Sequence, residues 1–544
     1  MRLTESANAT QRPDGHTQRY DRQLRIWNKT GQVCLEQARV LVVGASSLSA
    51  QILKNLVLPG LGGFTVLDDA LVTLEDAGSN FFLEPHTSVG KPYADEMARL
   101  LAEMNPSVEH AACVVSPAAM LTCDPSYFTK FSLIILVRQP WDVQERVDRL
   151  VWEHSPAIPV LSADNVGFQG IFRTSVRELG IIETHPESLV DLRLTRPFPA
   201  LEAYADSFDV HPSSSLDMGH IPYVVLLLRA LKEWKETHGE LPWSATRADF
   251  LAFLQRRCPR HGDLENYDEA HAALAQHVWR PLQSPAIPPS VEGILNDIQS
   301  LNVNQKSSIF WLLVAALRAF VAEEHVLPLP GALPDMKATS NTYVALQQVY
   351  VTKARQDLDK FTAHLDRILD RLMLSRDALG LDASQTRTFV KHAAHLKLVR
   401  GRCLSQQRTD PDVGAFAAAF ADPVNPITVQ FLIAFFASDT FLAKYGRFPG
   451  EENAFEQDAD ALFNCAKAYL DEVHFSLSLP DEARLQTACE ELARSAHSDI
   501  ATTAAFLGGI VAQEAIKILT IQYLPLDNAL VYDGIVEGVG SIRL

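Results

Sequence analysis

The chain has 544 residues, and its 66 acidic and 48 basic residues give it a formal net charge of −18. This length suffices for roughly two to four domains with full hydrophobic cores, and the acidic charge disfavours nucleic acid and anionic membranes as partners. No apolar run approaches the roughly 20 residues that span a bilayer. The seven cysteines, scattered without a C-x-x-C pair, indicate a reducing cytoplasmic or nuclear setting with no disulfide framework and no thiolate metal site.

The first pattern in the chain is YDRQLRIW, at residues 20–27. It predicts an amphipathic helix in which Leu24, Ile26 and Trp27 are packed while the arginines, Arg22 among them, are solvated. Gly31 then leads into a second helical stretch over 32–37.

Residues 38–69 contain the unit around which the rest of the chain is arranged. Arg39–Val43 is a short apolar strand that ends on Gly44, Leu48–Val57 has apolar residues at helical spacing, and Phe64–Leu67 is a second strand followed by Asp68. Strand, small-residue turn, helix, strand and acid is the layout of a mononucleotide-binding βαβ unit. In that unit the helix N-terminus faces phosphate and the acid faces a ribose.

The turn of this unit departs from a dinucleotide-binding loop. Such a loop has glycines at its first, third and sixth positions so that the backbone can approach the pyrophosphate, and here those positions are Gly44, Ser46 and Ser49. A serine can donate hydrogen bonds, but its Cβ occupies space that the phosphate needs. The pattern favours an architectural βαβ unit and leaves a working nucleotide site as the alternative.

Strand-like and helical runs continue to about residue 186, where the chain becomes mainly helical. Helices are predicted over 91–105 and 141–154, and strands over 108–115, 132–137, 158–162, 167–177 and 181–184. This alternation predicts a parallel, doubly wound sheet with helices on both faces. The irregular stretch 70–89 is long for a loop between core elements, and long ordered loops are often functional.

The middle of the chain is mainly helical. Apolar helices are predicted over 221–234, 308–324, 453–473 and 481–496, the last two with Asn453 and Asp481 as N-caps. A further helix has apolar residues at steps of three and four, which predicts a packing seam: Leu358, Phe361, Leu365, Ile368 and Leu372. An internal bundle core is favoured for this seam over a helix of another chain.

The α/β character returns near the end. Residues 498–520 form a mostly apolar helix that contains Gly508-Gly509, and each mid-helix glycine costs about 1 kcal/mol against alanine. We expect this pair to permit close approach to another backbone, most naturally that of the sheet. With short strands over 530–532 and 541–544, the sequence predicts a Rossmann-like part over 1–170, a mainly helical insertion over 171–490 and a second Rossmann-like part over 491–544.

Longer blocks of the chain resemble one family, the non-catalytic (amyloid-precursor-protein-binding-protein-like, Ula-type) subunit of the activating enzyme for the ubiquitin-like modifier Nedd/Rub. The similar blocks extend over nearly the whole chain: RYDRQLRIWNKTGQ at 19–32, ILKNLVLPGLGGFTVLDD at 52–69, EDAGSNFFLEPHTSVGK at 75–91, DLRLTRPFP at 191–199, LPDM at 333–336, GRFPG at 446–450 and AAFLGGIVAQEAIKI at 504–518. The resemblance implies a ThiF/MoeB-type fold. Its mainly helical insertion would correspond to one half of a catalytic-cysteine domain, and that half lacks the cysteine.

The resemblance also implies a regulatory subunit that is not an enzyme by itself. Its partners would be the catalytic subunit, which adenylates the modifier with ATP and magnesium and then takes it as a thioester, and the Nedd/Rub modifier. This chain would bind no cofactor and no metal, and it would contribute no catalytic residue.

Several positions differ from the pattern of the family's catalytic subunits. The glycine-rich loop reads GASSLS at 44–49, SNFF at 79–82 replaces a phosphate-gripping Asn-x-x-Arg-Gln stretch, and Arg138 stands where an aspartate would hold magnesium. Without the phosphate-gripping arginine and the magnesium-holding aspartate, the chain lacks most of the groups that would neutralise the phosphate charge during adenylation. Asp68, Lys91 and Asn80 remain, and we interpret them as relics that cap or pair within the fold.

Arg22 has a sharper predicted role. In the family, an arginine of the YxRQ block in the inactive subunit reaches the ATP of the partner chain, and Arg22 occupies that position here. It would act in trans like an arginine finger, with packing of its own helix as the alternative.

Two other functions remain open from the sequence. A self-sufficient ThiF/MoeB-like adenylating enzyme would need a live nucleotide site at Gly44, Ser46, Ser49, Asp68 and Lys91, which the altered positions disfavour. A nicotinamide-dependent oxidoreductase would rest on the βαβ unit alone, and the two serines count against it.

Overall fold

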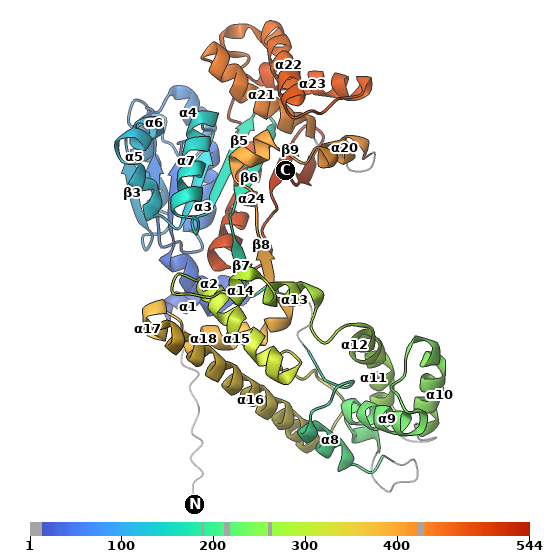
Figure 1. Cartoon of the computed structure of the whole chain (residues 1–544). Coiled ribbons are helices and arrows are strands. Elements are labelled where there is room, and N and C mark those ends of the chain that lie inside the picture. The colour runs from blue at the N-terminus through green and yellow to red at the C-terminus, as the bar shows by residue number, and fades with distance from the viewer. Residues whose placement is uncertain (1–13, 186–189, 211–217, 259–263, 423–428) are drawn as a thin grey trace, which may run out of the picture. The chain divides into compact units, whose positions relative to one another are not determined.

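The computed structural model of the protein describes residues 14–185, 190–210, 218–258, 264–422 and 429–544 (Figure 1). The chain forms two compact units: Met1–Leu179 together with Leu398–Leu544, and Gly180–Lys397. We call them unit 1 and unit 2. The chain thus leaves unit 1 once and returns to it, as a split Rossmann-like fold requires.

Unit 1 is built on an eight-stranded sheet with the strand order β10-β9-β6-β5-β4-β1-β2-β3. Neighbouring strands from β3 to β5 are parallel, whereas the β5–β6, β6–β9 and β9–β10 pairs are antiparallel. The predicted doubly wound sheet is therefore confirmed in its parallel half, and antiparallel strands extend it. The bounds are β1 (Arg39–Val43), β2 (Gly63–Leu67), β3 (Glu109–Cys113), β4 (Leu133–Val137), β5 (Val160–Val166), β6 (Gln169–Ser175), β9 (Ala529–Asp533) and β10 (Gly538–Ile542).

Helices cover both faces of the parallel half. Val40 and Val42 of β1 belong to a core with α2, α3, α5 and α24, whereas Leu41 and Val43 belong to a core with α6 and α7. Alternate residues of one strand thus enter two different cores, as expected for a sheet buried on both sides. The helices are α1 (Gly15–Arg19), α2 (Asp21–Gln37), α3 (Ser47–Val57), α4 (Leu74–Ser79), α5 (Tyr93–Ala102), α6 (Pro117–Cys123), α7 (Trp141–His154) and α24 (Ala501–Thr520), with a 3-10 turn over Pro125–Lys130.

Helix α24 corrects two expectations. By length and composition it could span a membrane, so the expectation that no apolar run is long enough to do so is wrong. Leu507, Val511 and Ala515 of this helix are fully buried in the core of unit 1. A Cβ on Gly508 would lie 2.8 Å from the Cβ of Gln51 and 3.1 Å from the backbone nitrogen of Ile52, both in α3. The close approach is therefore to a helix and not to the sheet, and Gly509 has open space around it.

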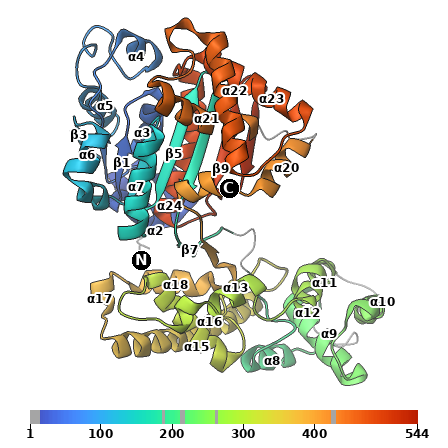
Figure 2. The ribbon, with the colours of Figure 1, turned by 45° about the horizontal axis from the view of Figure 1, so that its top comes forward.

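The last helices before α24 belong to unit 1. Four of them, between Val413 and Ser495, pack on Val166, Ile171, Ala529 and Val531 of the antiparallel strands, and Figure 2 shows these four grouped next to β9. Leu404 of the first helix belongs instead to the core with α7. Unit 1 consequently resumes at Leu398, whereas the predicted second part begins at 491. These helices are α19 (Leu404–Thr409), α20 (Val413–Ala421), α21 (Val429–Tyr445), α22 (Phe455–Glu472) and α23 (Leu479–Ser495), with a 3-10 turn over Glu451–Asn453.

Unit 2 is helical. In its longest helix, α16, Phe361 and Leu365 are fully buried, and the Phe361 ring lies 5.7 Å from that of Phe389 in α18. The predicted seam is therefore an internal core. The elements are α8 (Pro199–Asp206), α9 (Tyr223–His238), α10 (Arg247–Arg257), α11 (Glu265–Leu274), a π-helical turn η4 (Ala275–Trp279), α12 (Arg280–Gln283), α13 (Pro289–Leu295), α14 (Ile298–Leu301), α15 (Ile309–Glu324), α16 (Ser340–Leu372), α17 (Arg376–Leu379) and α18 (Ala383–Lys391), with 3-10 turns at Met218–His220, Ser244–Thr246 and Ala393–His395 and short strands β7 (Leu179–Ile181) and β8 (Lys397–Val399) where the chain crosses between units.

Two predicted N-caps are wrong. The N-cap of α23 is Ser478, whose side chain accepts a hydrogen bond from the backbone N–H of Asp481, and the residue before α22 is Ala454 instead of Asn453. Pro480 in the first turn of α23 allows the helix to begin two residues before Asp481 because a proline there lacks only an N–H that has no helical partner.

Candidate functional site

The βαβ turn lies at the carboxyl end of β1. Gly44 has a φ of +100°, and its N–H donates to the carbonyl of Leu67. A Cβ at this position would lie 2.2 Å from the carbonyl oxygen of Val137 in β4. The glycine is thus required by the backbone of the sheet itself, whether or not a ligand is bound.

The two serines of the turn cap α3. The N–H of Ser49 donates to the Ser46 side chain at 3.1 Å, and the N–H of Ser46 donates to the Ser49 hydroxyl at 2.7 Å. Both residues are buried. This reciprocal capping box satisfies N–H groups that a phosphate would bind in a dinucleotide site.

Two carboxylates accept hydrogen bonds from further backbone N–H groups of the same turn. Asp68 accepts from the backbone of Ala45 at 2.7 Å and of Ala70 at 2.6 Å. Asp499, which precedes α24, accepts from the N–H of Ser47 at 2.8 Å. The negative charge at the N-terminus of α3 therefore comes from the chain, and a phosphate group brought there would meet the Asp499 carboxylate. These residues do not fit a nucleotide phosphate.

A cation stands at the carboxyl end of β4. Arg138, with a φ of +53°, donates to the carbonyl of Asn165 at 2.5 Å and to the carbonyl of His497 at 2.6 Å. Burial and Arg138 hold the pKa of His497 well below its usual value. Asn165 in turn donates to Asp499 at 2.9 Å. Arg138 is thus tied into the fold, at a place where magnesium coordination would require oxygen ligands.

Asp68, Lys91 and Asn80 each pair within the fold. Burial raises the pKa of Asp68, while its two backbone hydrogen bonds oppose that shift. The Lys91 ammonium lies 3.3 Å from the carboxylate of Glu96, and the buried Asn80 amide donates to the hydroxyl of Tyr93 at 3.0 Å. In the described ranges, no group of three or more His, Cys, Asp or Glu side chains could hold a metal ion.

Arg22 lies on α2, outside this cluster. Its side chain is exposed and makes no hydrogen bond or ion pair with any residue that the structure describes, whereas Arg25 pairs with Asp21 at 3.0 Å. Trp27 anchors the helix, because it is buried and its carbonyl accepts from Gln522. The prediction that Ile26 is packed is wrong, since Ile26 is 49% exposed.

Sequence reasoning missed Asp499, Asn165, Asp164 and His497. Asp499 reaches Ser47 across 452 positions of the sequence, and no local pattern connects the two. The sequence shows only that Asp499 lies shortly before a strongly apolar helix. That position indicates the start of a helix but does not indicate a contact with Ser47.

Asp164 should make unit 1 sensitive to pH. Burial raises the pKa of this carboxyl to about 7, although Arg138 opposes the shift, and its Oδ1 has no hydrogen-bond partner in the described part of the chain. A carboxyl with a raised folded-state pKa destabilises the fold increasingly as pH rises from about 4 to about 7, and constantly above. Asp164→Asn should therefore raise Tm by a few degrees at pH 8 and less at pH 5.

The control for this prediction is Asp359→Asn on the exposed side of α16. Thermal unfolding of both variants at pH 5 and pH 8 checks it. An equal effect of Asp164→Asn at the two pH values would contradict the buried carboxyl as the cause.

The sheet, its turn and the flanking helices define a ThiF-type Rossmann-like protein, and the model described as the ThiF family matches residues 20–543. The chain is 34% identical to the NEDD8-activating enzyme E1 regulatory subunit of Xenopus laevis over 97% of this chain and 98% of that relative. It is 32% identical to the protein of the same name from Gallus gallus, over 97% and 98% of the two chains. It is 33% identical to the NEDD8-activating enzyme E1 regulatory subunit AXR1 of Arabidopsis thaliana, over 95% and 94%. The chain belongs to the family of NEDD8-activating enzyme E1 regulatory subunits, as its sequence blocks predicted.

Proposed function

We propose that this chain performs no adenylation itself and supports a catalytic partner that binds ATP and magnesium and carries the modifier, of the NEDD8 type, as a thioester. The observation that carries this proposal is that the backbone N–H groups of the turn at the N-terminus of α3 are already hydrogen-bonded within the chain. Its N–H groups at Ala45, Ser46, Ser47 and Ser49 all donate to side chains of the chain itself. Adenylation needs such donors and a metal to stabilise the charge of the reacting phosphates.

Four of the seven cysteines support the same proposal. A thioester-forming cysteine needs access and a thiolate, whereas burial raises the pKa of the thiols of Cys258, Cys403, Cys465 and Cys489. Cys403 is used as the N-cap of α19. These thiols are poor candidates for the acceptor, which we assign to the partner.

An apolar surface of unit 1 is suited to that partner. The Phe506 ring of α24 lies 4.5 Å from that of Tyr532 in β9, and Tyr532 is paired across the strands with the exposed Val539 of β10. The exposed Ile535 and Val536 form the turn of the same hairpin. Since β10 is also the last strand of the sheet, this surface combines exposed apolar side chains with an edge strand, both typical of protein interfaces.

Val536→Asp should weaken the heterodimer at least tenfold, because an interface would have to bury an unpaired carboxylate, at a cost of about 1.4 kcal/mol or more. Val536 is 64% exposed, so the fold of the chain should not depend on it. Titration calorimetry or gel filtration with the catalytic chain measures the effect. Val344→Asp on α16, at a side chain that is 51% exposed in unit 2, is the control and should bind normally.

The proposed function itself is tested by ATP–pyrophosphate exchange in the presence of the modifier. The assay compares this chain alone, the catalytic chain alone and their mixture. We expect exchange above background only when both chains are present, with the thioester on the partner. Exchange by this chain alone would overturn the proposal and favour a self-sufficient adenylating enzyme.

A further inference from the structure

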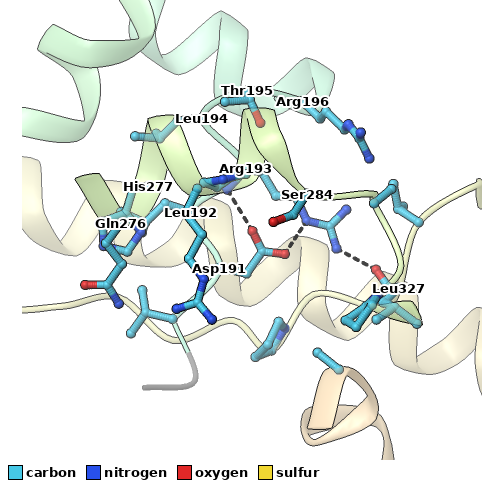
Figure 3. A pocket seen from close by; sticks show the side chains of 18 of the residues that line it. Asp191, Leu192, Arg193, Leu194, Thr195, Arg196, Gln276, His277, Ser284 and Leu327 are labelled. Carbon is cyan, nitrogen blue, oxygen red and sulfur yellow. Dashed lines mark hydrogen bonds and ion pairs between the residues drawn. The ribbon is translucent and has the colours of Figure 1, made fainter. Parts of the chain in front are cut away.

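Unit 2 contains a cavity of about 1120 Å³. Its wall is formed by the segment 190–196, the π-helical turn η4 with α12, the segments 284–289 and 326–330, and the C-terminal end of α18 with the turn that follows. Figure 3 shows the side chains of Asp191 and Arg193 from the first segment and those of Gln276 and His277 from η4. The volume is ample for a small-molecule ligand.

The lining of this cavity is positively charged, in contrast to the whole chain. It contains four cations, Arg193, Arg196, Arg280 and Lys391, against one acid, Asp191. Asp191 is already paired, because the Nε of Arg193 donates to it at 2.6 Å. The formal net charge of the lining is therefore +3 with both of its histidines neutral, in a chain whose formal net charge is −18.

Three of the four cations have unused donors. The side chains of Arg196, Arg280 and Lys391 are exposed, and none of them makes a hydrogen bond or ion pair with the residues that the structure describes. Elsewhere in unit 2 cations are commonly paired, as Lys353 is with Asp357 at 2.7 Å and Arg376 with Asp366 at 2.7 Å. Clustered like charges without counter-charges repel one another, and an anion between them removes that repulsion.

The backbone at the cavity is held in two unusual conformations. Arg193 has a φ of +52°, fixed by its N–H and Nε bonds to Asp191 and by a 2.5 Å bond from its guanidinium to the carbonyl of Leu327. The turn that contains His277 is π-helical. Left-handed non-glycine residues and π-turns each cost energy and are concentrated at ligand sites.

The two histidines of the lining add donors and acceptors without adding charge. Burial lowers the pKa of His277. Burial and the nearby Lys397 and Arg280 lower the pKa of His395. The lining thus combines exposed cations with partly buried, neutral histidines, which suits a ligand with several anionic groups.

We propose that this cavity binds a small polyanion with two or more phosphate or carboxylate groups, held by Arg196, Arg280 and Lys391. Arg193 lies between Asp191 and Leu327 and is a positioning residue, because it fixes the segment that carries Arg196. All lining residues of the cavity belong to unit 2. The inference does not depend on the proposed function.

The test uses the full chain and two probes, inorganic tripolyphosphate and citrate, in titration calorimetry at 150 mM salt. The cavity variant combines Arg196→Gln, Arg280→Gln and Lys391→Gln. The control variant removes the same charge from exposed positions of unit 2 outside the cavity, with Arg318→Gln, Arg355→Gln and Arg371→Gln.

We expect at least one probe to bind the unmodified chain and the control variant, with affinity at least tenfold weaker in the cavity variant. Binding of tripolyphosphate alone would identify a phosphate ligand, and binding of citrate alone a carboxylate ligand. Failure of both probes to bind at millimolar concentration would overturn the proposal. Equal weakening in the cavity and control variants would also overturn it, since that would indicate nonspecific attraction.

Discussion

Replacing Arg22 with alanine should slow ATP–pyrophosphate exchange by the assembled heterodimer at least about 100-fold. An arginine that reaches a neighbouring active site stabilises charge on the reacting phosphates, and such fingers contribute about 10³–10⁵-fold in phosphoryl transfer. The Arg22 side chain is exposed and without a hydrogen bond or ion pair among the described residues, so its loss should cost unit 1 no stability. The measurement is the exchange rate at subsaturating ATP, with gel filtration to verify that the heterodimer remains intact.

Arg25→Ala is the matched control for this prediction. Arg25 is another exposed arginine of α2, but it pairs with Asp21 one turn earlier, and its removal should leave exchange unchanged. Arg22→Lys should recover part of the rate, because lysine restores the charge without the planar fork of donors. Normal exchange by Arg22→Ala would exclude the role in trans, and equal losses in both alanine variants would indicate a general effect on α2.

Local sequence signals were sufficient to delimit single elements of unit 1. The predicted strand Arg39–Val43 and helix Trp141–His154 have the bounds that the structure shows. Both are delimited by turn residues or a proline, and each has the apolar spacing of a single element type. The departure of the turn from a dinucleotide-binding loop was also visible, because the positions of Gly44, Ser46 and Ser49 can be compared with a glycine pattern one residue at a time.

The sequence could not specify which element of the fold each apolar helix face packs against. The helices over 413–495 have buried faces, but nothing in their spacing indicates that they pack on β6 and β9 and so belong to unit 1. The same holds for Gly508, whose neighbour is α3, and for Asp499, whose partner Ser47 is 452 positions away. Such contacts depend on the arrangement of whole elements, which local periodicity does not encode.

Gly44→Ala should destabilise unit 1 by about 3 kcal/mol, even though we propose that no nucleotide binds there. A left-handed backbone costs an alanine about 1–2 kcal/mol, and the new Cβ would lie 2.2 Å from the carbonyl oxygen of Val137. That oxygen belongs to the central strand β4, so the conflict can be relieved only by moving the sheet, at a further cost of about 1–3 kcal/mol. Urea unfolding of the isolated chain and of the heterodimer measures the loss.

Two further variants separate a structural glycine from a ligand-binding one. Gly509→Ala is the control, because Gly509 is helical with open space around it, and alanine there should stabilise the chain by up to about 1 kcal/mol. Ser46→Gly restores one glycine of the nucleotide pattern, but it removes the side-chain cap of α3. It should therefore lower stability slightly and bring no ATP binding, because Asp499 still occupies the N-terminus of that helix. If Gly44→Ala were as stable as the unmodified chain, the sheet would not require this glycine, and a phosphate ligand would again be the better reason for it.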